Sequence, residues 1–467
     1  MNIPDSSTVP AKTPADTAPA ESQADESRVR PTPAPGVSSP PRLYPAVWRW
    51  HFYAGLLVAP IFLVITVTGA LYVFRTELTN LRDHSILFVE PQSERLGYDE
   101  LREIAARATA PRKLEAVIVH PEANRSVRFV AEMDADDDHD HEAHQHLIVY
   151  MNPYTGEILD QRIAEHDFFS IVLDIHRSLM LGTPGRVVGE LATSWGLLLL
   201  ATGVFLWWPR GKKNVGVWLP RVRGKLYSVL RDWHAVAGIY LMPLAFLIIG
   251  TGMFFTVVWG SGFVQTIKAA GHIPPGWFGD KQSPPPAPDA KPASLDKVVA
   301  TVLAEGRPQD TISIVLAGSP EVAHKAWYLQ DENKNTYNML AVDQYSGEGI
   351  LSVKCNEVPP LYKARMLAVS IHMGQIFGMP TKILALLTSF GLMGLVVTGL
   401  WMWWTRRPTG RSGFPRRPKP GSVPVWGWII IVFCGVLLPV AGASILLIMI
   451  VDRVLLAIRR QAPSPAG

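Results

Sequence analysis

Five apolar segments of membrane-spanning length constrain this chain more than any other feature. The hydrocarbon core of a bilayer is about 30 Å thick and needs about 20 apolar residues in a helix that crosses it. We therefore predict a polytopic, helical membrane protein. The predicted spans are Tyr53–Phe74, Val187–Trp208, Ile239–Val258, Ile383–Trp404 and Val425–Ile450.

Two short stretches between the predicted spans, residues 210–231 and 406–423, are rich in basic residues and contain no acidic residue. Short basic loops favour the cytoplasm. We therefore expect a cytoplasmic N-terminus, two large loops outside and a C-terminus outside, although Arg453, Arg459 and Arg460 favour the opposite side for the tail. The basic residues are Arg210, Lys212, Lys213, Arg221, Arg223, Lys225 and Arg231 in one loop, and Arg406, Arg407, Arg411, Arg416, Arg417 and Lys419 in the other.

The N-terminal residues 1–42 are rich in Pro, Ala, Ser and Asp and lack the apolar core of a signal peptide. We expect a disordered cytoplasmic tail, with the first span as an uncleaved anchor. Cys355 falls in an outer loop and Cys434 in the last span. We therefore expect no disulfide between them, and the sequence has no CxxC site.

The chain contains an internal duplication, which is a strong guide to its architecture. RWHFYAG, which includes His51, opens the first span, and DWHAVAG, which includes His234, opens the third. The second and fourth spans are likewise preceded by IHRSLMLGTP, with His176, and IHMGQIFGMP, with His372, and they end in TGVFLWW and TGLWMWW. Further residues recur at equal offsets from the paired histidines: Gly55 and Gly238, Pro60 and Pro243, Thr68-Gly69 and Thr251-Gly252, Gly182 and Gly378, and Pro184 and Pro380.

Each large outer loop shows the pattern of a small α+β domain. A stretch with helical periodicity is followed by alternating runs typical of strands and then by a turn, YTGE in the first loop and YSGE in the second. A Pro-rich stretch, Pro274–Pro292, reads as a linker. The predicted helices are Tyr98–Thr109 and Ser294–Glu305, and the predicted strands are Leu114–His120, Arg125–Glu132, His146–Asn152, Thr311–Ala317, His324–Gln330 and Tyr337–Asp343.

Over about Tyr44–Arg407, this arrangement resembles the PepSY-associated transmembrane proteins. The features in common are HxxxG opening one span, a helix-and-hairpin domain outside, an IHxxxxxGxP segment, and a span ending in WW before basic residues. Members of that family include inner-membrane ferric-siderophore reductases that bind haem b. The resemblance implies two periplasmic PepSY-like domains and a role in iron uptake.

The predicted topology restricts how the four repeated histidines can pair. His51 and His234 fall at the cytoplasmic ends of two spans, while His176 and His372 fall near the outer ends of the other two. A helix of about 20 residues is roughly 30 Å long, so an inner and an outer histidine cannot share a metal. Two imidazoles from different helices suit bis-histidine haem ligation, and we expect two b-type haems.

Gly55 and Gly238 each follow an inner histidine by one helical turn and would leave room for a flat porphyrin. Zinc is less suited, because structural zinc sites use more ligands. The alternative is that the histidines are interfacial anchors, as are the tryptophans Trp207, Trp208, Trp403 and Trp404.

The segment DADDDHDHEAHQH (Asp134–His146) interrupts the repeat, because the second domain has only ENKN at the matching hairpin. Imidazoles and carboxylates together suit Zn, Ni or Cu. The segment is either a metal-binding loop or a solvated hairpin tip. Its candidate ligands are His139, His141, His144 and His146.

The leading functional hypothesis is an oxidoreductase of the ferric-chelate reductase type, which carries electrons across the inner membrane to a periplasmic ferric-siderophore or other metal complex. No nucleotide motif is present, so the electrons would come from quinol or a partner reductase. One alternative is a non-redox protein whose outer domains bind a partner or regulate a protease. Another is a metal transporter or sensor that uses the His-rich loop, although none of the first four spans has a charged residue deep in its middle.

The predicted fold is a membrane all-α bundle of five transmembrane helices with a two-fold internal repeat and two periplasmic α+β PepSY-like domains. The expected boundaries are 1–42 for the cytoplasmic tail, 43–75 for the first span, 76–170 for the first outer domain, 171–209 for an interfacial helix and the second span, 210–231 for a basic loop, 232–260 for the third span, 261–365 for the linker and second outer domain, 366–405 for an interfacial helix and the fourth span, 406–423 for a basic loop, 424–452 for the fifth span, and 453–467 for the tail.

Overall fold

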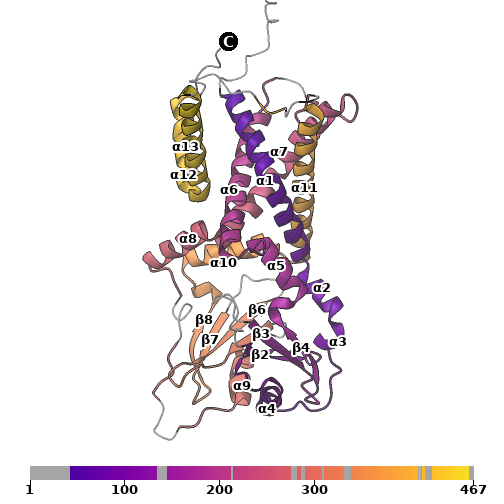
Figure 1. Ribbon diagram of the computed structural model, residues 1–467. Helices are drawn as coiled ribbons and strands as arrows, with labels where there is room; N and C mark the ends of the chain where they lie inside the picture. The colour runs from indigo at the N-terminus through magenta and orange to yellow at the C-terminus, as the bar shows by residue number, and fades with distance from the viewer. Residues whose placement is uncertain are drawn as a thin grey trace, which may run out of the picture. The chain divides into compact units, whose positions relative to one another are not determined.

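The computed structural model describes residues 43–133, 145–211, 214–274, 281–285, 290–307, 310–330, 338–408, 410, 413–415 and 423–461. Within these residues, four helices are long and apolar enough to cross a membrane, and they pack together as a bundle (Figure 1). The third continues through a short 3₁₀ turn, η2 (Met253–Phe255). The four helices are α1 (Tyr44–Tyr72), α6 (Gly182–Trp207), α7 (Leu226–Gly252) and α11 (Met379–Arg406).

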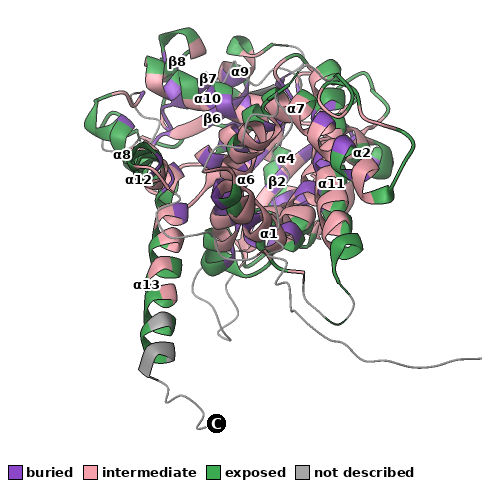
Figure 2. Ribbon diagram, turned by 90° about the horizontal axis from the view of Figure 1, so that it is seen from above, coloured by how far each residue is buried: buried purple, intermediate pink, exposed green. Residues whose placement is uncertain are grey.

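The predicted fifth span is not a single helix. The structure divides it into α12 (Val425–Leu437) and α13 (Pro439–Gln461), which contact each other near the turn between them, and in Figure 2 α13 runs away from α12 beyond that turn. The chain reverses between them, and the backbones meet so closely that a Cβ atom on Gly442 would lie only 2.9 Å from the Cα atom of Gly435. Pro439 lacks the N–H that would continue α12. The segment is therefore a helical hairpin, and α13 ends on the same side of the bundle as α12 begins.

The tip of the α12–α13 hairpin packs against the bundle. Leu438 and Ala441, at its tip, form an apolar cluster with Met253 of η2. The indole nitrogen of Trp195 on α6 donates a hydrogen bond to the hydroxyl of Ser444, at 3.0 Å. At 1.5 Å per residue, the 13 residues of α12 rise about 20 Å, which is short of a bilayer core.

The two outer segments form one continuous antiparallel sheet of eight strands, in the order β4-β3-β2-β1-β5-β6-β7-β8. The central pair joins a strand from the first segment to one from the second, with Val117 opposite Ile314. The sequence predicts six of these strands to within a few residues, but it does not predict that the two segments share a sheet. The strands are β1 (Leu114–Val119), β2 (Val127–Met133), β3 (Gln145–Met151), β4 (Ile158–Ile163), β5 (Asp310–Val315), β6 (His324–Gln330), β7 (Asn338–Val342) and β8 (Gly349–Val353).

Helices α4 (Tyr98–Thr109) and α9 (Leu295–Glu305) pack with the sheet in one apolar core, which contains buried residues from both segments. Their first turns cap each other. The carboxylate of Asp296 accepts hydrogen bonds from the backbone N–H groups of Tyr98 and Asp99, at 2.6 and 3.2 Å, and Asp99 accepts one from the N–H of Leu295, at 2.9 Å. Each carboxylate therefore satisfies N–H groups that the other helix leaves unpaired.

Short helices connect the bundle to the sheet, and buried carboxylates fix two of these connections. Asp83 receives hydrogen bonds from Arg82 and Arg162; burial alone would raise its pKa, but these bonds outweigh burial and lower it. Glu190 on α6 is fully buried and accepts the N–H groups of the first two residues of α8, at 2.7 and 2.9 Å. The connecting helices are α2 (Arg75–Arg82), α3 (His84–Leu87), η1 (Ala164–His166), α5 (Phe168–Ser178), α8 (Val258–Ala269), η3 (Cys355–Glu357) and α10 (Pro360–His372).

Candidate cofactor site

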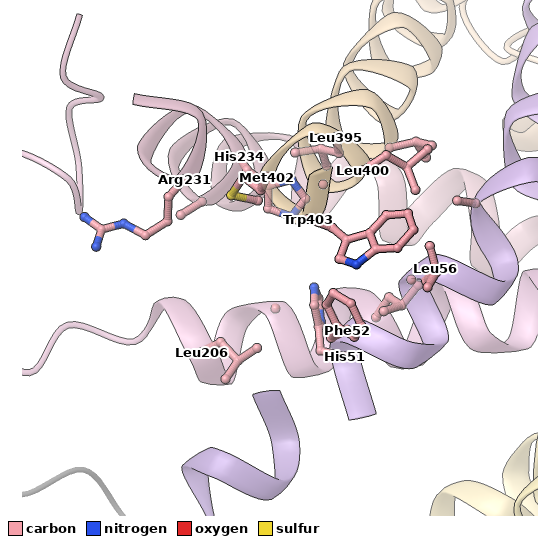
Figure 3. Close-up of a pocket in the computed structure, with 18 of the residues that line it drawn as sticks. His51, Phe52, Leu56, Leu206, Arg231, His234, Leu395, Leu400, Met402 and Trp403 are labelled. Carbon is pink, nitrogen blue, oxygen red and sulfur yellow. The ribbon is translucent and has the colours of Figure 1, made fainter. Parts of the chain in front are cut away.

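The inner pair of histidines meets inside the bundle. His51 on α1 and His234 on α7 have ring centres 6.5 Å apart, with the ring planes almost perpendicular, at 88°. Both side chains project into one cavity, which is shown in Figure 3. The pairing predicted from the repeat is therefore present in the structure.

A threonine hydroxyl fixes the state of each inner imidazole. Nδ1 of His51 lies 2.9 Å from Oγ1 of Thr202, and Nδ1 of His234 lies 3.0 Å from Oγ1 of Thr398. Each hydroxyl already donates its proton to a carbonyl one turn earlier in its own helix, Thr202 to Leu198 and Thr398 to Gly394. The hydroxyl must then accept from Nδ1–H, which leaves Nε2 unprotonated and able to bind a metal.

The outer pair meets in the same way. His176 at the end of α5 and His372 at the end of α10 have ring centres 6.2 Å apart. Nδ1 of His176 lies 2.9 Å from the carbonyl oxygen of Ile65, and Nδ1 of His372 lies 2.9 Å from that of Ile248. A carbonyl can only accept, so Nδ1 donates and Nε2 is again the free nitrogen. Metal-binding histidines are typically oriented by such a bond.

Both separations fit two imidazoles on opposite sides of one metal ion. A metal–imidazole bond is about 2.0–2.1 Å, and the centre of an imidazole ring lies about 1.1 Å from its nitrogens, so the ring centres would be about 6.2 Å apart. The observed values are 6.5 and 6.2 Å. The donor set of two neutral imidazoles is the one that bis-histidine haem proteins use for electron transfer.

Glycines lie against all four imidazole rings. A Cβ atom on Gly69 or Gly252 would lie 2.9 Å from Cε1 of His176 or His372, which is too close for any larger residue. A Cβ atom on Gly203 would lie 3.6 Å from Cε1 of His51, and one on Gly399 would lie 3.5 Å from Cε1 of His234. In the sequence Gly69 and Gly252 are only recurring residues of the repeat, whereas the structure places them directly against the outer histidines.

The two glycines that the sequence singled out, Gly55 and Gly238, line the inner cavity. A Cβ atom on them would meet Leu199 and Leu395 at ordinary contact distances of 3.9 and 3.7 Å. They therefore border the space beside the imidazoles rather than the rings themselves.

The inner cavity has a volume of about 620 Å³, which lies within the range of about 300–1,000 Å³ typical of small-molecule sites. Its deep end is lined by apolar residues from all four spans, including Phe62, Ile249 and Leu392. Its other end is lined by aromatic and basic residues, including Trp403, Arg231 and Arg406. A flat amphiphile with one apolar edge and one charged edge would match this gradient.

The His-rich loop can be followed only at Gln145 and His146, because His139, His141 and His144 lie outside the described residues. Nδ1 of His146 lies 2.9 Å from a carboxylate oxygen of Glu165, and Nε2 lies 3.5 Å from one of Glu115. Over the part of the chain that the structure describes, there is no group of three or more His, Cys, Asp or Glu residues that could hold a metal ion.

Thr202 and Thr398 are the site residues that the sequence analysis did not assign. Each lies the same number of residues after the outer histidine of its half, within the repeated TG that closes the second and fourth spans. That equal spacing is a signal for a shared role, but their contact with His51 and His234 joins residues more than 150 positions apart.

An antiparallel sheet beside a bundle of membrane-length helices, with histidines paired between the helices, defines a polytopic membrane protein. The chain belongs to the family described as the PepSY-associated TM region, whose model matches residues 48–406. The match includes all four paired histidines and ends before the α12–α13 hairpin. A search of curated proteins found no match.

Proposed function

We propose that this protein is a b-haem oxidoreductase of the bacterial inner membrane, which carries electrons across the membrane to a periplasmic ferric-siderophore or another metal complex in iron uptake. The observation that carries the proposal is the matched geometry of the two histidine pairs. In both pairs the ring centres are 6.5 or 6.2 Å apart, which is the separation expected for two imidazoles that bind one metal ion. Each Nδ1 has an acceptor, so that both Nε2 atoms can bind the metal.

The residues fit two haems, one between His51 and His234 and one between His176 and His372. A bound haem supplies reversible one-electron transfer between Fe(III) and Fe(II). The chain contributes four neutral imidazoles whose orientation is fixed by Thr202, Thr398 and two backbone carbonyls. Two imidazoles at each site would hold the haem iron with the donor set that favours electron transfer over binding of oxygen.

The direction of transfer follows from the basic loops. With Arg210–Arg231 and Arg406–Lys419 in the cytoplasm, the N-terminus is cytoplasmic and the inner pair lies on the donor side. The α12–α13 hairpin supports this orientation, because α13 would then end, with Arg453, Arg459 and Arg460, on the same side of the membrane as the basic loops.

The donor is a quinol or a partner reductase. A quinol gives up two electrons and two protons when it is oxidised, so one quinol would reduce two ferric complexes to the ferrous state. Fe(II) is held less strongly than Fe(III) by hard oxygen chelators, which would release the iron.

The test is the visible spectrum of the purified full-length protein, oxidised and dithionite-reduced, together with its haem content. We expect two b-type haems per chain. His51→Ala or His234→Ala should remove one, and His176→Ala or His372→Ala the other. His166→Ala, which changes an exposed histidine outside both pairs, should keep both.

A colourless wild-type protein from haem-replete cells would contradict the proposal. So would a haem content that none of the four paired histidines changes. In that case the non-redox alternative, in which the outer sheet binds a protein partner, predicts that binding of this partner survives loss of all four imidazoles.

A further inference from the structure

Two arginines stand at the charged end of the inner cavity. Arg231 lies on α7, almost one turn before His234, and Arg406 is the last residue of α11. Both line the cavity, and no carboxylate is among its lining residues in the part of the chain that the structure describes. An apolar space that ends in two cations is suited to a ligand with a carboxylate or phosphate group at one edge.

The surrounding charges leave this end positive. Nε and Nη2 of Arg231 donate to one oxygen of Asp232, at 3.1 and 2.7 Å, and Arg221 donates to the other oxygen. Asp232 is fully buried, and its one carboxylate is shared between the guanidinium groups of Arg221 and Arg231. The guanidinium of Arg406 lies over the ring of Trp48, 5.0 Å from its centre, and adds a further positive charge.

The two halves of the chain differ at these positions, although they match at the histidines. The counterpart of Arg231 in the first half is Trp48. The counterpart of Arg406 is Arg210, which stacks on Tyr44 at 4.7 Å and is not among the residues that line the cavity. Both arginines that line the cavity therefore come from the second half of the chain. The positive charge is asymmetric between the two halves, although each half contributes one histidine.

We propose that Arg231 and Arg406 bind the two propionate carboxylates of the haem held by His51 and His234. This inference rests on the proposed function, because it takes the inner cavity to hold a haem. The two histidines alone would allow the haem to bind in more than one orientation. The arginines would select the orientation in which its carboxylates lie at their end of the cavity. The carboxylate edge faces the start of α7 and the end of α11, where the basic loops lie, and the hydrocarbon edge lies among Phe62, Ile249 and Leu392.

The experiment compares haem b with its dimethyl ester, in which both carboxylates are blocked. Each is titrated into full-length protein that carries His372→Ala, so that only the inner pair coordinates, and the dissociation constant is read from the Soret band. Arg231→Gln and Arg406→Gln are each expected to weaken haem b about tenfold and to leave the ester unchanged, because a charge-assisted hydrogen bond needs the free carboxylate.

Arg210→Gln is the matched control, because it removes an arginine that stacks on an aromatic ring at the equivalent helix end outside the cavity. It should leave both affinities unchanged. Equal weakening of haem b and the ester by the cavity variants would overturn the inference, since the arginines would then bind a lipid phosphate or stabilise the fold. Binding of neither compound to the parent protein would instead defeat the proposed function itself.

A variant that fails to fold is recognised separately. With His372 intact, Arg231→Gln and Arg406→Gln should keep the spectrum of the outer pair. If they do so and still bind haem b as tightly as the parent protein, the arginines do not hold the propionates.

Discussion

A neutral imidazole offers one nitrogen to a metal and donates a proton from the other, so the partner of the donating nitrogen fixes the state of the ligand. In this protein the inner histidines use threonine hydroxyls and the outer histidines use backbone carbonyls, although Oγ1 of Thr68 also lies 3.3 Å from Nδ1 of His176. The backbone acceptors cannot be removed by substitution, but the hydroxyls can. The threonines are therefore the residues at which this arrangement can be tested.

We expect Thr202→Val and Thr398→Val to lower haem affinity at the inner pair by about 10- to 100-fold, because valine keeps the shape of threonine but cannot accept from Nδ1–H. Titration of haem into each variant would measure the change. Thr193→Val is the control, since Thr193 on α6 also donates to a carbonyl one turn earlier but has no histidine partner among its described hydrogen bonds. An equal loss of haem affinity in all three variants would show that the hydroxyls stabilise only their own helices.

The four histidines and their pairing could be predicted from sequence, because a duplicated motif places equivalent residues at equivalent helix ends. The hydrogen-bond partners could not be assigned, because a threonine in an apolar helix has the same sequence signature whether it bonds its own backbone or a distant ring. Gly69 and Gly252 show the same limit, because the repeat marks them only as equivalent residues and the structure alone shows that each lies against an imidazole.

Among the elements, the α12–α13 hairpin departs most from the sequence prediction. Val425–Ile450 is uniformly apolar, and a proline does not by itself break such a helix, since α1 and α7 continue through Pro60 and Pro243. Pro439 differs because Gly435 and Gly442 lie on either side of it and let the two backbones touch. That contact is a tertiary feature, which the periodicity of the segment does not record.

The hairpin predicts the location of the C-terminus. Alkaline phosphatase fused after Gly467 should be inactive and a fluorescent protein at the same position should fold, because both would lie in the cytoplasm with the basic loops. Phosphatase fused after Ser93, beyond the outer end of α1, should be active. Active phosphatase after Gly467 would restore a fifth complete crossing.

At the scale of the whole molecule, the two histidine pairs occupy opposite ends of one bundle. On α1, His51 and Gly69, which faces His176, are 18 residues apart, or about 27 Å along the helix axis. The distance is close to the thickness of the bilayer core. Electrons would therefore cross the membrane between two sites held by the same four helices.

Proteoliposomes separate the two sites. With a reductant enclosed on the cytoplasmic side, the wild-type protein should reduce a ferric chelate added outside. His372→Ala should keep a reducible inner haem and lose reduction of the chelate, because its outer site is absent. Undiminished reduction by this variant, measured from a colorimetric ferrous chelator outside, would show that the outer pair is not on the path.

The shared sheet also limits how this protein can move. Transporters built from repeats commonly rock one repeat against the other to expose a central site to each side in turn. Here the strand pair β1–β5 joins the two halves through four paired positions, and Asp99 and Asp296 cap each other's helices across the same seam. Rocking of one half against the other would have to break the hydrogen bonds between β1 and β5 in every transport cycle. The shared sheet therefore favours a fixed arrangement of the two halves, and the electron transfer proposed above would require no change in it.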